Sequence, residues 1–224
     1  MVEDFYLLLN KLHNKIPFSF AHFNDGEMSF ILDCDRTPIS RGYQDYSKEL
    51  KIKLKEAFLI NNKEFYRGIP CSTCYHHLRQ GALQLLKDNN TICSITMATL
   101  FHNSFVTTNR LVCETLKNYT ITWVINDRYN IEHICNRIGL DVTKSKTIIV
   151  PSRNAFGTEI DENFDTEMVI FLCGPIGRIL AGTCFEKHPS KTFLCLGSYF
   201  DYVFGTVYQY HVSDKMCSEC CFRV

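Results

Sequence analysis

The chain has 224 residues, of which 46% are apolar and 21% are charged, as is usual for a globular protein with one sizeable core. Lysine plus arginine and aspartate plus glutamate both number 24, so no basic excess indicates nucleic acid or an anionic membrane as the main partner. No window reaches the roughly 18 apolar residues of a membrane span, and the amphipathic N-terminus lacks a signal-peptide pattern, so we expect a cytoplasmic protein.

Hydrophobic periodicity and turn residues predict helices that alternate with short strands. The strands are apolar, and many end in glycine or proline, which is typical of a parallel sheet covered on both faces. We therefore predict a Rossmann-like α/β fold with a mostly parallel sheet of about six to seven strands and helices on both faces. In chain order, we expect a helix at 3–15, a strand at 17–23, helices at 27–32 and 47–60, a strand at 64–69, a helix at 75–87, a strand at 91–97, helical structure at 98–117 with a break near 106, a strand at 119–125, a helix at 129–138, strands at 147–150 and 168–173, a helix at 176–186 and a strand at 192–196.

Turns that follow the strands predict where a ligand binds. In parallel α/β sheets, ligands bind beyond the carboxyl ends of the strands. Five turns are therefore expected along one edge of the sheet: the turn at Asp25, Gly68-Ile69-Pro70, residues 151–154, Gly174-Pro175 and Gly197-Ser198.

Two carboxylates flank a glycine directly after the first predicted strand, in Asp25-Gly26-Glu27. Asp-Gly is a strong turn signal, and oxygen ligands at this spacing suit a hard divalent cation such as Mg²⁺ or Mn²⁺. The alternative is a surface turn in which Glu27 complements a helix N-terminus. A second acidic pair, Asp33-Cys34-Asp35, spells the Asp-x-Asp motif that one class of glycosyltransferases uses, but only about thirty residues precede it. That position favours solvated loop acids.

Two later turns carry groups that suit a nucleotide. Gly174 and Pro175 lie between an apolar strand and a helix, where free backbone N–H groups hold a phosphate or a ribose, although proline also fits an ordinary helix start. Ser152, Arg153 and Asn154 offer hydroxyl, guanidinium and amide groups, or form a plain polar loop. Neither a G-x-G-x-x-G after the first strand nor a P-loop occurs, which disfavours NAD enzymes and P-loop ATPases.

Twelve cysteines are present, and most stand singly in apolar runs, as buried reduced thiols do. Cys71-x-x-Cys74, followed by His76 and His77, and the tail cluster Cys217-x-x-Cys220-Cys221 would make a zinc site only if the two halves met. Separate free thiols are the alternative. We expect one domain over residues 1–212, with a cysteine-rich tail over 213–224.

In these segments the chain resembles the GT-D-type glycosyltransferases, a family typified by a bacterial glucosyltransferase domain that extends glycans on serine-rich adhesins. The resembling pieces run in family order from about residue 17 to 205: residues 20–27 with Asp25-Gly26-Glu27, residues 42–46 with Gln44, Gly68-Ile69-Pro70, residues 150–156, Gly174-Pro175 and residues 197–201. Departures from the family pattern at His22, Asn24 and residues 197–201 leave the sugar and the third metal ligand open.

The resemblance implies that Asp25 and Glu27 bind Mn²⁺, or Mg²⁺, together with the diphosphate of a nucleotide sugar, with a UDP-sugar favoured. Nucleotide-sugar contacts are expected from Ser152, Arg153, Asn154, Gly174, Pro175, Gln44 and Ser198. Asp201 is expected on the acceptor side, as a general base or a sugar contact, because it follows a strand end. Glu159 and Asp161 compete for that role.

Three functions follow from this pattern. The first is a metal-dependent glycosyltransferase that moves a hexose to a hydroxyl of a glycan or glycoprotein. The second is a catalytically silent binding module stabilised by zinc, and the third is metal-dependent hydrolysis of a phosphoester, with water as the acceptor. The stereochemical outcome and the oligomeric state, including a homodimer, stay open.

Overall fold

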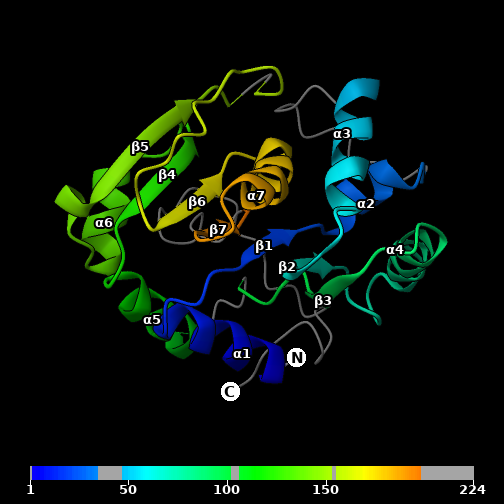
Figure 1. The fold of residues 1–224 in the computed structure, drawn as a ribbon, viewed down its shortest axis with the longest axis horizontal. Helices are drawn as coiled ribbons and strands as arrows, with labels where there is room; N and C mark the ends of the chain where they lie inside the picture. The colour runs from blue at the N-terminus through cyan, green and yellow to red at the C-terminus, as the bar shows by residue number, and fades with distance from the viewer. Residues whose placement is uncertain (1, 35–46, 102–105, 153–154, 198–224) are drawn as a thin grey trace.

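The computed structural model of the chain describes residues 2–34, 47–101, 106–152 and 155–197. Its strands form one seven-stranded sheet in the order β3-β2-β1-β7-β6-β4-β5 (Figure 1), and all neighbouring strands run parallel. This confirms the predicted α/β fold. The strands are β1 (Ser19–His22), β2 (Asn62–Ile69), β3 (Cys93–Met97), β4 (Ile121–Asn126), β5 (Ser145–Val150), β6 (Met168–Leu172) and β7 (Thr192–Cys195).

Helices cover both faces of the sheet. Buried side chains of α2, α3, α4 and α7 pack on one face, which we call the α7 face, and those of α1, α5 and α6 pack on the other, the α6 face. Within the described residues, no helix combines the length and the apolar character needed to cross a membrane. The helices are α1 (Val2–His13), α2 (Asp25–Ile31), α3 (Lys48–Phe58), α4 (His76–Asp88), α5 (Val106–Leu116), α6 (Ile131–Ile138) and α7 (Pro175–Lys187), with a short 3₁₀ helix η2 (Val142–Lys144).

The connections reverse direction between β6 and β4. From β6 the chain passes through α7 on one face to β7, towards the β3 edge, whereas from β4 it passes through α6 on the opposite face to β5, towards the other edge. Figure 1 shows α6 beside β4 and β5 at one end of the sheet and α7 over β6 and β7. In open α/β sheets such a reversal marks the point where ligands bind, outside the carboxyl ends of the strands.

Helix α7 lies close against the sheet because it carries a glycine where it crosses β6 and β7. A Cβ atom at Gly177 would lie 2.9 Å from Cβ of Phe171 and 3.2 Å from Sγ of Cys173 and of Cys195. Any larger residue there would push the helix outwards. Gly177 therefore fixes the height of the α7 N-terminus above the carboxyl ends of these strands.

Arg67, on β2, is fully buried and is held by backbone carbonyl groups. Its guanidinium donates hydrogen bonds to the carbonyl oxygens of Phe58, Ile60 and Phe65. Because α3 ends at Phe58, the positive charge lies at the negative end of that helix. Burial lowers the pKa of Arg67 to about 10, which leaves it charged at neutral pH. This arginine ties α3 to β2 and is a structural group.

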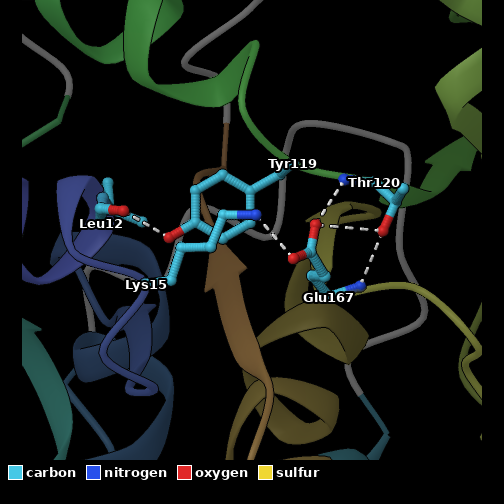
Figure 2. A network of polar contacts seen from close by, with 5 residues as sticks. All are labelled: Leu12, Lys15, Tyr119, Thr120 and Glu167. Atoms are coloured by element: carbon cyan, nitrogen blue, oxygen red, sulfur yellow. Dashed lines mark hydrogen bonds and ion pairs between the residues drawn. The ribbon is translucent and has the colours of Figure 1, made fainter.

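A polar network joins the end of α1 to the amino ends of β4 and β6 (Figure 2). Lys15 pairs with Glu167 at 2.7 Å, and the Glu167 carboxylate also accepts a hydrogen bond from the backbone N–H of Thr120 at 3.0 Å. The hydroxyl of the buried Tyr119 donates to the carbonyl oxygen of Leu12. These contacts lie at the edge opposite the carboxyl ends of the strands, so they hold the sheet together rather than bind at its functional edge.

Replacing Tyr119 with phenylalanine is expected to remove a pH-dependent part of the stability. Burial raises the pKa of Tyr119 to about 12, so its hydroxyl stabilises the fold below pH 10, and this contribution is lost as the pH rises from 10 to 12. At pH 8 we expect Tyr119→Phe to be less stable by about 1 kcal/mol because the Leu12 carbonyl loses its donor. Urea unfolding of both proteins between pH 8 and 12 tests this; a gap that stays constant over that range would contradict it.

Candidate functional site

The acidic turn is placed at the carboxyl end of β1, near the centre of the sheet. β1 ends at His22, Asn24 is the N-cap of α2, and Asp25 and Glu27 lie in the first turn of that helix. Glu27 is 8% exposed, and one of its oxygens accepts a hydrogen bond from the Asn24 backbone N–H at 3.3 Å. Glu27 therefore complements the N-terminus of α2, as the alternative from the sequence expects, but it is buried and does not lie in a surface turn.

Glu27 is also bound by a buried arginine that the sequence analysis missed. Nη2 of Arg178, in the first turns of α7, lies 3.0 Å from Oε1 of Glu27. The same guanidinium donates through Nε to the His22 carbonyl oxygen at 2.9 Å, and Nη2 lies 3.1 Å from Nδ1 of His22. Since arginine only donates hydrogen bonds, Nδ1 accepts, and the neutral imidazole carries its proton on Nε2. Arg178 therefore locks α7 onto the end of β1.

Gly197, directly after β7, leaves room for this cluster. Its φ is +58°, a conformation that glycine adopts without strain, and a Cβ atom there would lie 3.2 Å from Nδ1 of His22. A side chain at position 197 would therefore press on the imidazole that Arg178 contacts.

The thiols of Cys173 and Cys195 lie beneath Gly177 of α7. Burial raises the pKa of both thiols, so they remain neutral and do not act as thiolate ligands or nucleophiles.

The two carboxylates fit a divalent cation that shares its ligands with a substrate. The half-buried Asp25 carboxylate makes no hydrogen bond or ion pair with any described residue, whereas each Glu27 oxygen has a protein donor and keeps a lone pair. Over the described ranges, no group of three or more His, Cys, Asp and Glu side chains could hold a metal ion. Mg²⁺-type ions usually take one or two carboxylates, with water and substrate phosphates as the remaining ligands. Asp25 offers one such carboxylate, whereas Glu27 is buried and paired with Arg178.

The N-terminus of α7 provides the second element of the edge. Gly174, with φ +68°, is the N-cap, and Pro175 is the first helical residue and is buried. β6 lies two strands from β1, so this helix start is about 10 Å along the edge from the Asp25 turn. Helix N-termini attract anions, and the α7 start lies on the same edge of the sheet as the acidic turn.

The loop after β5 lies farther away. Its Ser152 is half-buried, and its backbone N–H donates to the Asp127 carboxylate at 3.2 Å. β5 is four strands from β1, so Ser152 lies about 19 Å along the edge from the acidic turn. Glu159 and Asp161, farther along this loop, are exposed, and Asp161 accepts the Asn163 backbone N–H. Predicted site residues outside the described ranges are Gln44, Arg153, Asn154, Ser198 and Asp201.

The competing acidic and cysteine motifs lie elsewhere. Asp33 is exposed and forms an ion pair with Lys51, as a solvated loop acid does. Cys71 is buried and Cys74 exposed in the turn that precedes α4, while the tail cysteines at 217, 220 and 221 fall outside the described residues. The described cysteines are all free thiols, of which Cys135, Cys173, Cys184 and Cys195 are buried as expected and Cys93 and Cys113 are half-buried.

Comparison with known proteins gives a likeness in fold. Neither a protein-family model nor a curated protein matches the sequence. A solved structure of the domain of unknown function 1792, described as having a distinct glycosyltransferase fold, superposes with a TM-score of 0.58 and 16% identity. The match covers 88% of this chain and 79% of the other. At this identity the likeness shows the fold, so the seven-stranded sheet described above is a glycosyltransferase-type fold.

Proposed function

We propose that this protein is a metal-dependent glycosyltransferase that transfers a hexose from a nucleotide diphosphate sugar, most favourably a UDP-sugar, to a hydroxyl of a glycan or glycoprotein. The observation that carries the proposal is the position of Asp25, which presents a carboxylate without a partner among the described residues at the carboxyl end of a central strand. The likeness to a glycosyltransferase fold supports the same class of reaction.

Each residue of the site has a role in this proposal. Asp25 would hold Mn²⁺ or Mg²⁺, and Glu27 would face the same ion with the lone pairs that Asn24 and Arg178 leave free. The metal, when bound, would neutralise the negative charge that grows on the leaving diphosphate. Arg178 is a positioning residue, since it fixes the Glu27 carboxylate. The α7 start, capped by Gly174, would receive a phosphate at the positive end of its helix dipole, since Pro175 has no N–H and the Gly177 N–H already donates to the Gly174 carbonyl oxygen.

The acceptor side of the site remains a proposal from the sequence. Asp201 would accept the proton of the acceptor hydroxyl or contact the sugar, with Glu159 and Asp161 as the competing carboxylates. Gln44, Ser152, Arg153, Asn154 and Ser198 are proposed to contact the nucleotide sugar. We propose a cytoplasmic setting for the enzyme.

A thermal-shift screen of UDP- and GDP-sugars, each with and without Mn²⁺, tests the proposal. A ligand that binds only the folded state at 100 times its Kd should raise the Tm by roughly 5 to 10 °C for a chain of this size. We expect such a rise for one nucleotide sugar in the presence of Mn²⁺ and a much smaller one without metal. If no nucleotide sugar raises the Tm with either Mn²⁺ or Mg²⁺, the proposal fails. Product analysis then separates transfer from hydrolysis.

A further inference from the structure

We propose that Asn126, the last residue of β4, contacts the nucleoside of the sugar donor. This inference rests on the proposed function and adds a residue to it. The chain connections reverse between β6, which leads into α7, and β4. Asn126 ends β4 and therefore lies at this reversal. No motif in the sequence singles it out.

The side chain of Asn126 points to the same face as α7. Along β4, Trp123 and Ile125 belong to the core of the α6 face, while Val124 belongs to the core of the α7 face. Asn126 is still in register with Val150 of β5, so the alternation of the strand continues through it. Its amide therefore lies on the α7 face, next to the strand that leads into Gly174.

The amide oxygen of Asn126 has no hydrogen-bond partner among the described residues. Asn126 is 3% exposed, and its Oδ1 atom is fully buried. Most buried polar atoms in proteins have a partner, so an orphaned acceptor calls for a specific cause. Thr122, on the same strand and face, follows the usual rule, since its hydroxyl bonds to that of Thr166 at 2.7 Å. Within the described residues, the Thr122 hydroxyl near the amino end of β4 therefore has a hydrogen-bond partner, whereas the Asn126 amide oxygen at the carboxyl end has none.

Asn126 lies along the sheet edge where one end of the bound nucleotide sugar is expected. β4 is three strands from β1, about 14 Å, and one strand beyond the α7 start. The sugar and the nucleoside are attached to opposite ends of the diphosphate. A diphosphate held between the Asp25 turn and the α7 start therefore places one of these ends beyond β6, over the end of β4. Asp127 and Arg128 follow Asn126 and are exposed, so the chain reaches solvent directly beyond the buried amide.

The chemistry of a primary amide selects the kind of group that binds. Oδ1 accepts and Nδ2 donates, which matches a ring N–H beside a carbonyl oxygen. Uracil and guanine present this pair of groups on one edge. The ligand that this site would take is therefore a nucleoside diphosphate with such a base, in agreement with a UDP-sugar as the donor.

Two variants of β4 separate a binding role from a structural one. Asn126→Leu keeps the approximate size of the side chain and removes an unpaired polar group, so its Tm should equal or exceed that of the wild type. Its affinity for UDP in the presence of Mn²⁺ should fall at least tenfold, while its affinity for inorganic pyrophosphate should not change. Thr122→Val, the control, should lower the Tm, because it removes the buried hydrogen bond between Thr122 and Thr166 while Thr166 keeps its bond to the Met168 carbonyl oxygen, and it should bind UDP as the wild type does.

Calorimetry of these proteins with UDP and with pyrophosphate distinguishes the outcomes. If the wild type binds UDP and Asn126→Leu binds it equally well, Asn126 does not contact the nucleoside, and the proposed function stands. A parallel loss of UDP and pyrophosphate affinity would also overturn the inference, because it would indicate a general disturbance of the site. If the wild type binds no nucleotide with Mn²⁺, the proposed function itself fails.

Discussion

Replacing Asp25 with asparagine is expected to abolish the Mn²⁺-dependent stabilisation by the nucleotide sugar and to lower turnover on the order of 100-fold or more, because metal ligation supplies several kcal/mol of charge stabilisation. The fold should survive the change. Asp25 is half-buried in the first turn of α2, where a negative charge stabilises the helix by only about 0.3–1 kcal/mol. A thermal-shift titration with Mn²⁺, with and without the sugar donor, measures both effects on one sample.

Asp33→Asn is the matched control for this experiment. Asp33 is an exposed carboxylate just beyond α2, and Lys51 is its partner. It also belongs to the Asp-x-Asp sequence that competes with the Asp25 motif. We expect Asp33→Asn to keep the Mn²⁺-dependent shift in full. Equal shifts in the wild type and Asp25→Asn would remove Asp25 from the site, and loss of the shift in Asp33→Asn would move the metal to the second motif.

The elements of the fold could be predicted because their signals are local. Ile121 to Asn126 and Met168 to Leu172 are apolar runs that become wholly buried strands, and Gly139 ends α6 in the left-handed conformation that its position after the apolar pattern indicates. Once each strand was located, the parallel topology followed from the alternation with helices. The shared edge of the strand ends followed from that topology, and the parallel pairing of the described strands confirms it.

The contacts within the site could not be predicted in this way. Arg178 lies 151 residues from Glu27 by their numbers, and nothing in either neighbourhood specifies the pair. One signal was present: Arg178 is a charged residue among the apolar residues of the first turns of α7, where a cation is unfavourable with respect to the helix dipole. Asn126 looked like an ordinary strand end, since only strand order reveals that it lies where the connections reverse. The sequence also predicted that Ser152 lies at the carboxyl ends of the strands, but it did not show that four strand spacings separate Ser152 from Asp25.

Replacing Arg178 with methionine is expected to destabilise the protein by about 3–5 kcal/mol, because it leaves the Glu27 carboxylate buried without its countercharge. The side chains of Arg178 and Glu27 are only 6% and 10% exposed, so little solvent screens the pair. Lys187, on the same helix, pairs with Glu162 of the loop after β5, and the two side chains are 59% and 27% exposed, so Lys187→Met should leave the stability nearly unchanged. Urea unfolding of the two variants provides this comparison within one helix.

The double variant Arg178→Met with Glu27→Gln separates stability from function. Glutamine keeps the size of Glu27 and removes its charge, so most of the loss caused by Arg178→Met should be recovered, with a coupling free energy of about 2 kcal/mol or more between the two positions. Mn²⁺-dependent binding of the nucleotide sugar should stay weak in the double variant, because the second carboxylate of the site is gone. If the two substitutions are additive in stability, the ion pair does not hold α7 to β1. If the double variant binds the metal and donor as tightly as the wild type, the cation depends on Asp25 alone and Glu27 serves only the fold.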